Sequence, residues 1–442
     1  MSNGNTPVKH SRPIKLSIIT QFYPPDYAAT GQLIEQLAVQ LAQLGLLVQV
    51  FTGQPGYAFH KESAPAIEHL DRVAIRRSRS TRLWSKRIRG KALNGLLFCV
   101  RSGIHLLRTY SRGDVLLLTT APPFLPILGY LANKIFGLPY VCLLYDLYPD
   151  VAVELNVVSK HHRLVRFWDA VNRRIWKQAQ QIIVLSSSMK DRVVAKCPEV
   201  RHKIAVIHNW ADPKWIAPIP KHHNGFAKEF NLVNTFTVLY SGNMGRCHDM
   251  ETIFEAVKLL QAEPIQFVFI GNGAKRAVFR SQAEELGLHN CQFLPYQDKQ
   301  NLPYSLTACD LSLVSVSPGM EGLVAPSKLY AALAAGRPIA VICEQHSYLR
   351  SLVTDACCGE AFSNGDAAGL AAFIRRLAVD SQLVKQMGQA GRHYLLSNFT
   401  PELIAKQYSE VLHKAVFNKL ESSGAMSVEE IHPESLPIHK KI

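Results

Sequence analysis

The chain has 442 residues, of which 48% are hydrophobic and 19% charged, and its formal net charge is +15. A single core rarely serves more than about 250 to 300 residues, so this length predicts two domains. The nine cysteines are scattered without CxxC or Cys/His spacing, which argues against a disulfide framework or a zinc site and fits a reducing cytosol. The first dozen residues lack the apolar run of a secretory signal, and we therefore expect no export.

The first half of the chain alternates apolar runs with helix-length segments. Its first unit comprises the strand "KLSIIT" (15–20), a helix marked by leucines at helical spacing that ends at Gly45, and the strand "LVQVF" (47–51). Further runs read "DVLLLTT", "YVCLLYD" and "QIIVLSS". Continuous apolar runs are typical of parallel strands buried on both faces. We therefore predict a doubly wound, Rossmann-like α/β domain over residues 1–213.

Residues 115–133 carry no charge, which raises the question of a membrane span. Pro122, Pro123 and Pro126 interrupt this segment. Because proline breaks a helix interior, we predict a buried strand, a turn and a helix instead.

A basic segment lies between Arg72 and Gly113, with twelve Lys or Arg residues and no acid. Leucine, valine and isoleucine recur at helical spacing from Leu93 to Leu107, which predicts a basic amphipathic helix. Such a helix suits an anionic membrane surface; the alternative is a solvated basic face above an ordinary core stripe. Nucleic acid is not expected as a partner, because no recognised binding module accompanies the charge. The candidate membrane-binding residues are Arg87, Arg89, Lys91, Arg101 and Arg108.

A proline-rich polar stretch separates the two halves, and we place the interdomain linker at residues 214–225. The strands "FTVLYS", "IQFVFI", "DLSLVSV" and "RPIAVIC" then predict a second Rossmann-like domain over 226–399. We expect a helix at about 400–418 to pack back on the first domain, and residues 421–442 to form a disordered tail. Ligands of such sheets bind at the carboxyl ends of the strands, so the expected site lies in a cleft between the domains.

Three loops of the second half follow predicted strands and suit a phosphate group. "YSGNMGRC" offers glycines with Arg246, "FIGNG" offers two more glycines, and "APSKLYAALAAG" places Lys328 at a helix start. The structural alternative is that glycine merely permits a tight turn. No full GxGxxG fingerprint is present, and no acid follows at the ribose spacing, which argues against a nicotinamide or flavin cofactor.

These motifs, in this order, together with "YPPDYAATGQLIEQLAVQLAQLG" and "VIHNWAD", resemble the family 4 glycosyltransferases of GT-B fold. The resemblance is to the branch that builds bacterial exopolysaccharides such as colanic acid, and it runs from about Leu16 to Val416. It implies two Rossmann-like domains and a metal-independent, retaining hexosyltransferase without a cofactor. The donor would be a UDP-, GDP- or other nucleotide sugar, and the acceptor a lipid-linked molecule or a saccharide. The expected location is cytoplasmic, with peripheral attachment to the inner face of the membrane.

The resemblance also assigns residues, with departures from the family pattern. The usual pair of glutamates falls on Leu323 and Ala331, so both acids are missing, and Glu321 is the candidate acid. In the phosphate loop, Asn243 and His248 replace the usual arginine and lysine, which leaves Arg246 and Lys328 as cations. Asp146 follows the strand whose end lies beside the reacting sugar in relatives, and we expect it to activate or position the acceptor. The alternative is a purely structural acid that caps the next helix. The donor-binding candidates are Thr30, Gly31, Ser241, Gly242, Asn243, Gly271, Asn272, Gly273, Tyr296 and Ser327.

Two other functions remain open at this point. The missing glutamates suit a non-catalytic relative that binds a sugar nucleotide or a membrane as a scaffold. A GT-B sugar-nucleotide epimerase would instead convert its donor with no acceptor present. A glycosidase is disfavoured, because it needs two placed carboxylates and the site offers one.

Overall fold

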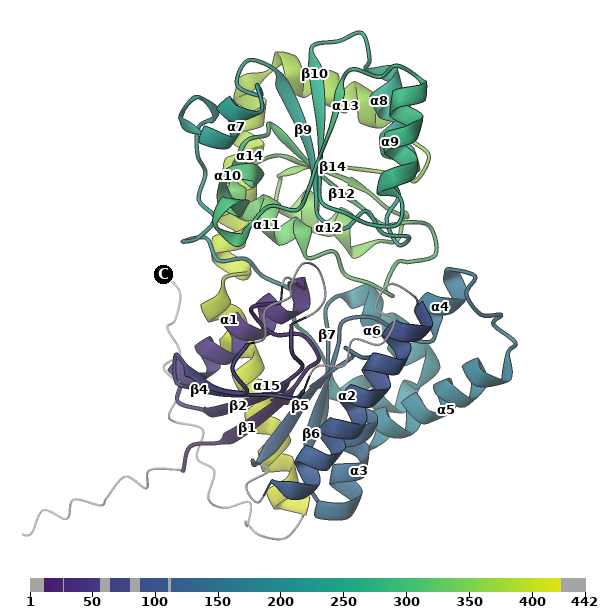
Figure 1. Cartoon of the computed structure of the whole chain (residues 1–442), viewed down its shortest axis with the longest axis vertical. Helices are drawn as coiled ribbons and strands as arrows, with labels where there is room; N and C mark the ends of the chain where they lie inside the picture. Colours follow the sequence, from purple (N-terminus) through teal and green to yellow (C-terminus); the bar gives the residue numbers. More distant parts are fainter. Residues whose placement is uncertain (1–11, 27, 56–63, 80–87, 110–112, 423–442) are drawn as a thin grey trace, which may run out of the picture.

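Two α/β domains lie one above the other (Figure 1). The structure is a computed structural model that describes residues 12–26, 28–55, 64–79, 88–109 and 113–422. Each domain contains one sheet of mainly parallel strands with helices on both faces. The predicted fold class, two doubly wound domains of GT-B type, is confirmed.

The N-terminal sheet has eight strands: β1 (Lys15–Ile19), β2 (Leu47–Thr52), β3 (Ile67–Leu70), β4 (Val73–Arg77), β5 (Val115–Thr119), β6 (Tyr140–Leu144), β7 (Gln181–Val184) and β8 (Ile204–Val206). Their order is β3-β4-β2-β1-β5-β6-β7-β8, and only the β3–β4 pair is antiparallel. The central strands β5, β6 and β7 are buried along their whole length, as their continuous apolar sequences require.

The helices of this domain are α1 (Ala29–Gln43), α2 (Ile88–Arg108), α3 (Ile127–Phe136), α4 (Asp150–Glu154), α5 (Arg163–Gln178) and α6 (Ser187–Lys196), with a 3₁₀ turn η1 (Pro198–Lys203). Helices α2, α3 and α5 lie side by side. The uncharged segment 115–133 forms β5, a turn and the start of α3, as predicted. Among the described helices, none combines the length and the apolar character needed to cross a bilayer.

The C-terminal sheet has six parallel strands: β9 (Phe236–Ser241), β10 (Ile265–Ile270), β11 (Cys291–Leu294), β12 (Leu311–Ser315), β13 (Ile339–Ile342) and β14 (Gly359–Phe362). Their order is β11-β10-β9-β12-β13-β14. The surrounding elements are η2 (Lys221–His223), α7 (Gly225–Glu229), α8 (Glu251–Leu259), α9 (Arg276–Glu285), η3 (Lys299–Asn301), α10 (Leu302–Thr307), α11 (Lys328–Ala335), α12 (Tyr348–Asp355), α13 (Ala367–Val379), α14 (Ser381–Asn398) and α15 (Pro401–Ser422).

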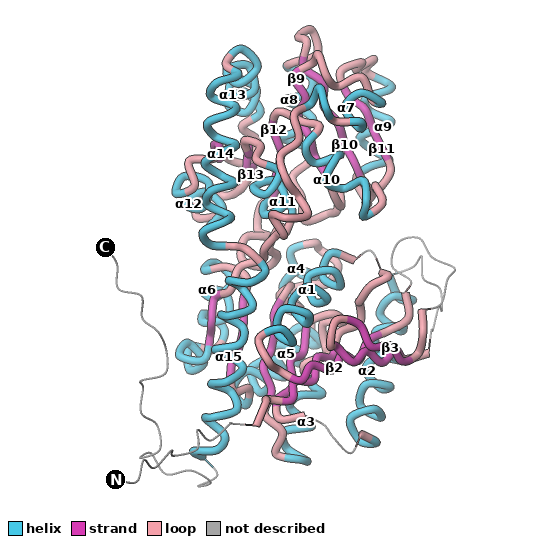
Figure 2. The backbone as a smooth tube through the Cα atoms, turned by 90° about the vertical axis from the view of Figure 1, so that its left-hand side faces the viewer, coloured by secondary structure: helices cyan, strands magenta, loops and turns pink. Residues whose placement is uncertain are grey.

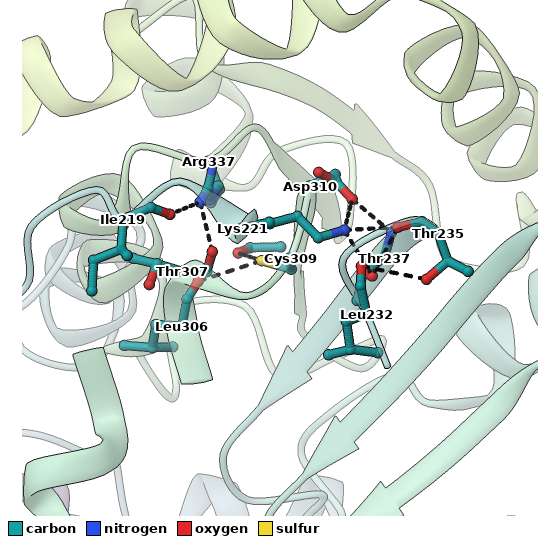
Figure 3. A network of polar contacts seen from close by, with 11 residues as sticks. Ile219, Lys221, Leu232, Thr235, Thr237, Leu306, Thr307, Cys309, Asp310 and Arg337 are labelled. Carbon is teal, nitrogen blue, oxygen red and sulfur yellow. Dashed lines mark hydrogen bonds and ion pairs between the residues drawn. The ribbon is translucent and has the colours of Figure 1, made fainter. Parts of the chain in front are cut away.

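The segment predicted as a linker is fixed to the C-terminal domain by polar contacts (Figure 3). The ammonium of Lys221 lies 2.6 Å from the Asp310 carboxylate and donates to the Thr235 carbonyl at 2.7 Å. Arg337 donates to the carbonyl oxygens of Ile219 and Thr307. The connection therefore ends in a rigid attachment at residues 219–221.

The chain returns to the N-terminal domain through α15, which packs on α1 and on strands β5, β6 and β7. Figure 2 shows α15 and α2 on opposite sides of the N-terminal sheet. The two crossings between the domains touch, because the Ala211 amide donates to the Phe399 carbonyl at 3.3 Å. Helix α15 extends to Ser422, so the predicted tail lies almost wholly outside the described residues.

Candidate functional site

Three loops of the C-terminal domain meet at one edge of its sheet. They follow β9, β10 and β12, which are neighbours in the sheet, and they lead into α8, α9 and α11. Because all three strands are parallel, their carboxyl ends lie at the same edge. The fold therefore brings together the three loops that the sequence singled out.

The first two loops bind each other directly. The Gly242 amide donates to the Ile270 carbonyl, and the Met244 amide donates to the Asn272 carbonyl, both at 2.8 Å. A Cβ atom on Gly271 would lie 2.1 Å from the Gly242 oxygen, and one on Gly273 would lie 2.5 Å from the Met244 oxygen. Close loop packing thus accounts for the glycines at 271 and 273, and the amides of residues 242 and 244 are already bonded to protein carbonyls.

Lys328 is the first residue of α11 and points into this group of loops. Its ammonium lies 2.5 Å from the Tyr240 hydroxyl and 3.9 Å from the centre of that ring. Its side-chain end also lies against Gly242, within 3.8 Å of where a Cβ of that glycine would be. Although part of the residue is accessible, the surrounding protein displaces water from the ammonium and lowers the pKa of Lys328 to about 7. No carboxylate of the described residues forms an ion pair with it.

His248 lies next to this lysine and is uncharged. Its Nδ1 atom lies 2.9 Å from the Ser315 carbonyl, which places the proton on that nitrogen. Burial, and then the nearby Lys328 charge, lower the pKa of His248 to about 3. Arg246 stands on the same loop with an exposed side chain. The site therefore holds one enclosed cation, Lys328, and one exposed cation, Arg246.

Asp146 joins the two domains at the end of β6. It forms an isolated antiparallel bridge with Val324, and the adjacent Leu147 amide donates to the Leu323 carbonyl at 3.0 Å. The residue is half-buried, and burial of its carboxyl group raises the pKa of Asp146 to about 6. Its charge also contributes to the raised pKa of Cys247, on the loop that carries Arg246. The structure thus places Asp146 between the two loops that carry the candidate cations.

Glu321 lies on the loop between β12 and α11, and its side chain is enclosed by the surrounding protein. The residue is 2% exposed, and its Oε1 atom is buried with no hydrogen bond. The role of Glu321 as the donor-site acid stays a prediction. The backbone of its loop is held by Arg192 of α6, whose guanidinium donates to the carbonyl oxygens of Glu321 and Gly319 at 3.1 and 3.3 Å.

The remaining candidates lie around the same region with different roles. Gly31 is buried in α1, where a Cβ would lie 3.0 Å from the backbone of Phe22 and Tyr23, so helix packing explains this glycine. The ring of Tyr296 lies 3.3 Å from where a Gly271 Cβ would be, and Asn243 accepts a hydrogen bond from the Tyr240 hydroxyl at 3.0 Å through its carbonyl. Thr30 lies in the first turn of α1, Ser241 ends β9, Asn272 follows Gly271, and Ser327 immediately precedes α11.

The structure describes the side chains of only two of the five candidate membrane-binding residues, Arg101 and Arg108. Arg87 lies outside the described residues, as do the side chains of Arg89 and Lys91. Arg101 donates to the Arg79 carbonyl, whereas Arg108 is exposed near the end of α2.

Two residues that sequence reasoning missed complete the site. Tyr240 holds the ammonium of Lys328, and Arg192 holds the loop that carries Glu321. Tyr240 stands directly before Ser241 in a strand already identified, so an aromatic hydroxyl at the strand end was an available signal. Arg192 has no local signal, because its partners lie more than one hundred residues away in the sequence.

Comparison with known proteins agrees with this arrangement. The family model "Glycosyltransferase Family 4" matches residues 30–215, and "Glycosyl transferases group 1" matches residues 225–394. A curated relative, "Probable glycosyltransferase WbjE" of Pseudomonas aeruginosa, is 25% identical over 402 residues, which cover 89% of this chain and 96% of that protein. The "Putative colanic acid biosynthesis glycosyl transferase WcaI" of Escherichia coli K12 is 27% identical over 50% of this chain and 55% of its own.

Solved structures share the fold at low sequence identity. The sucrose-phosphate synthase of Thermosynechococcus elongatus superposes with a TM-score of 0.72 at 19% identity, covering 93% of this chain and all of that one. HepE of Anabaena, solved in complex with UDP-glucose, has a TM-score of 0.66 at 16% identity and covers 90% of this chain and 99% of its own.

Proposed function

Since the chain belongs to the family 4 glycosyltransferases of GT-B fold, we propose that it transfers a hexosyl unit from a nucleotide diphosphate sugar to a lipid-linked or saccharide acceptor. Under this proposal the reaction retains the anomeric configuration and serves the synthesis of an exopolysaccharide. The name of the relative WbjE supports glycosyl transfer, and that of WcaI, a putative colanic acid biosynthesis glycosyl transferase, supports a role in polysaccharide assembly. The complex of HepE with UDP-glucose supports a nucleotide sugar as the donor.

The observation that carries the proposal is the position of Lys328. Departure of a nucleotide diphosphate leaves negative charge on its phosphates, and a preorganised cation stabilises that charge best in a site with little water. Lys328 stands at the start of α11, beside Gly242, with its ammonium held by Tyr240. The positive end of the helix dipole adds to the charge of the lysine. Arg246, on the neighbouring loop, is the second cation of this site.

Asp146 is the residue that we assign to the acceptor. It lies on the N-terminal domain and contacts, through Val324, the loop that leads into α11. A carboxylate at this position accepts a hydrogen bond from an acceptor hydroxyl and orients it toward the donor. Its pKa of about 6 leaves it mainly ionised at neutral pH, as this role requires.

We propose that no metal ion takes part, because Lys328, Arg246 and the start of α11 supply the positive charge that a metal would otherwise bring. Among the described residues, no three His, Cys, Asp or Glu side chains are grouped as ligands for an ion. Transfer measured in the presence of a strong chelator tests this point. Lost activity that returns with added Mg²⁺ or Mn²⁺ would contradict it.

The function is tested first with a panel of nucleotide sugars. A true donor stabilises the folded chain by an amount that grows with the logarithm of its concentration over its Kd and reaches about 2.7 kcal/mol at one hundred times Kd. The stabilising donor is then supplied with membrane-extracted polyprenyl-linked saccharides, and the linkage of the product is determined by NMR. The proposal would be rejected if no nucleotide sugar in the panel stabilised the chain against thermal unfolding.

A non-catalytic scaffold is the second candidate, and one observation favours it. At the two family glutamate positions the chain carries Leu323, which is fully buried, and Ala331. Stabilisation by a nucleotide sugar without hydrolysis or transfer is the result expected of a scaffold. Conversion of the donor sugar to its epimer without an acceptor would instead identify an epimerase.

A further inference from the structure

Three neighbouring helices of the N-terminal domain turn a row of large apolar side chains outward. Helices α2, α3 and α5 are adjacent, and Gln178 at the end of α5 donates to Asn133 of α3 at 2.8 Å. The outward side chains are Leu96, Val100, Ile104 and Leu107 of α2, Leu131 and Ile135 of α3, and Leu164 and Phe167 of α5, with exposed fractions between 41% and 67%. We call these eight residues, with the exposed basic residues Arg108 and Arg166 of the same helices, the three-helix face.

The three helices cover the same face of the sheet. Ile19, Phe51 and Leu118 are aligned in register across β1, β2 and β5, so their side chains point the same way. Phe51 stacks with Phe98 of α2, whereas Leu118 lies against Gly129 of α3.

The third helix joins this layer through Tyr140. This residue contacts Gly129 of α3, and its hydroxyl donates to the Ile175 carbonyl of α5 at 2.6 Å. Because all three helices pack inward on one face of the sheet, their exposed residues lie on the outer side of this helix layer.

The apolar row of α2 is not its core contact. Its core contact consists of Phe98, Cys99, Ser102 and Leu106, which are at most 6% exposed. Leu96, Val100, Ile104 and Leu107 lie on the opposite side of the helix, at 41% to 59% exposure. The helix therefore does have a core stripe, but Leu96, Val100, Ile104 and Leu107 do not belong to it. An exposed apolar row of this kind is typical of an interaction surface.

Charge indicates which partner fits. The sequences of α2, α3 and α5 contain one acid, Asp169, which is held by Lys196 at 2.6 Å. The same three helices contain ten basic residues: Arg89, Lys91, Arg101, Arg108, Lys134, Arg163, Arg166, Arg173, Arg174 and Lys177. Apolar side chains among cations match an anionic lipid surface, in which apolar groups enter the acyl boundary and the cations meet phosphate headgroups.

We propose that the three-helix face docks the protein on an anionic bilayer, with α2, α3 and α5 lying along the surface. The inference rests on the lipid-linked acceptor of the proposed function, because such an acceptor remains in the membrane and the enzyme must come to it. Leu107, Ile135 and Phe167, exposed at 59%, 62% and 67%, enter the acyl boundary. Arg108 and Arg166 contact the headgroups.

The first test measures co-sedimentation of the full chain with vesicles of phosphatidylcholine alone or with one quarter phosphatidylglycerol. Binding is expected only to the anionic vesicles, and the triple variant Leu107→Ser, Ile135→Ser, Phe167→Ser should bind at least about tenfold more weakly. The matched control changes three residues of the C-terminal domain that are exposed at 56%, 56% and 87%: Val278→Ser, Leu286→Ser and Val379→Ser. Equal binding by both triple variants would overturn the proposal.

The second test changes charge and does not depend on how the apolar variant folds. Each cation near an anionic surface contributes about fivefold to binding, so Arg108→Gln with Arg166→Gln should weaken vesicle binding about 25-fold at low salt. Lys228→Gln with Lys385→Gln, two exposed lysines of the C-terminal domain, is the control and should bind normally. In 1 M salt the difference in vesicle binding between the charge variant and its control should vanish, because the salt then screens charges more than about 3 Å apart.

Two further readouts separate this inference from the proposed function. Stabilisation by the donor and donor hydrolysis need no membrane, so both should be unchanged in the surface variants. If they are unchanged while vesicle binding is also unchanged, the surface is wrong and the enzyme assignment stands. If vesicle binding is lost as expected but no nucleotide sugar is bound by any form, the enzyme assignment fails instead. The apolar triple variant could instead bind vesicles normally but show a lower molecular mass by light scattering. That result would identify the face as a self-association surface and overturn the proposal.

Discussion

The ammonium of Lys328 is held by one aromatic residue, Tyr240, through both its hydroxyl and its ring. The Tyr240 hydroxyl in turn donates to the carbonyl of Asn243 in the phosphate loop. The cation, the strand end and the loop are thereby linked into one rigid unit, which is the arrangement that stabilises a developing charge without reorganisation.

Replacement of this cation should damage catalysis far more than folding. Lys328→Ala is expected to lower kcat/KM by 10² to 10³, or about 2.7 to 4 kcal/mol, because a preorganised donor to the leaving phosphate is lost. Steady-state kinetics with the identified donor measure the effect. The control is Lys275→Gln, a nearby lysine already paired with Glu251 at 2.8 Å, which should retain activity within a few fold. Near-normal turnover of Lys328→Ala would remove this residue from the mechanism.

Nucleotide diphosphate affinity should weaken as the pH rises. In the free protein the pKa of Lys328 is about 7, and binding of a diphosphate favours the ammonium and raises that value. Above pH 7, binding therefore takes up a proton, and Kd should rise by about tenfold per pH unit until the raised pKa is reached. Below pH 7 the lysine is already charged, so its contribution is constant. Calorimetry in two buffers of different ionisation enthalpy measures the proton uptake, which should disappear in Lys328→Met.

The value of kcat/KM should also fall at acidic pH, because Asp146 becomes protonated there. Burial raises the pKa of Asp146 to about 6, so its carboxylate form dominates above that pH and is lost below it. The value of kcat/KM is expected to decrease about tenfold per unit below pH 6. Asp146→Asn should remove this acid limb and lower kcat by about 10² to 10⁴, with little change in the affinity for the donor. If Asp146→Asn keeps the same decrease of kcat/KM below pH 6, the decrease belongs to another titrating group.

Arg192 should act by positioning the loop and not by touching the substrate. Arg192→Gln removes its hydrogen bonds to the carbonyls of Gly319 and Glu321, so the loop that leads to α11 becomes less ordered. We expect kcat to fall about tenfold, the effect of roughly 1.4 kcal/mol, while the Kd for the nucleotide changes by less than about threefold. Faster amide exchange over residues 319–324 separates this role from direct binding. Arg201→Gln, on the exposed face of η1, is the control.

The glycine at 271 should be required for stability. Its φ angle is +130°, and a Cβ would lie 2.1 Å from the Gly242 oxygen, so Gly271→Ala must displace backbone. A loss of more than about 2 kcal/mol in the free energy of unfolding is expected, from strain at this φ together with overpacking. Gly287→Ala is the matched control, because Gly287 also has a positive φ, of +62°, but nothing lies within 4 Å of its Cβ position. Urea unfolding of the two variants gives the difference.

Much of the fold follows from the sequence, since long buried strands such as β5 and β6 need continuous apolar residues. Short edge strands do not have this requirement. β3 and most of β11 are exposed or half-buried, and neither was predicted, because an edge strand pairs through its backbone with few apolar side chains.

The candidate site was predictable where a loop directly follows a strand, as for Gly242 and Lys328. It was not predictable where distant contacts decide the outcome. The backbone of Glu321 is held by Arg192, 129 residues earlier in the chain, and the orientation of the α2 leucines depends on which side of the helix meets Phe51.

The adjacent crossings at residues 211 and 399 restrict how the two domains can move. Two covalent connections that run side by side allow the two domains to rotate about the line that joins the connections. Sliding or twisting of one domain against the other would strain both connections. Lys214 and Glu402, paired at 2.9 Å, lie beside this axis and should keep their separation in every state. Opening should instead be greatest at positions farthest from the axis, where spectroscopic distance labels would report it.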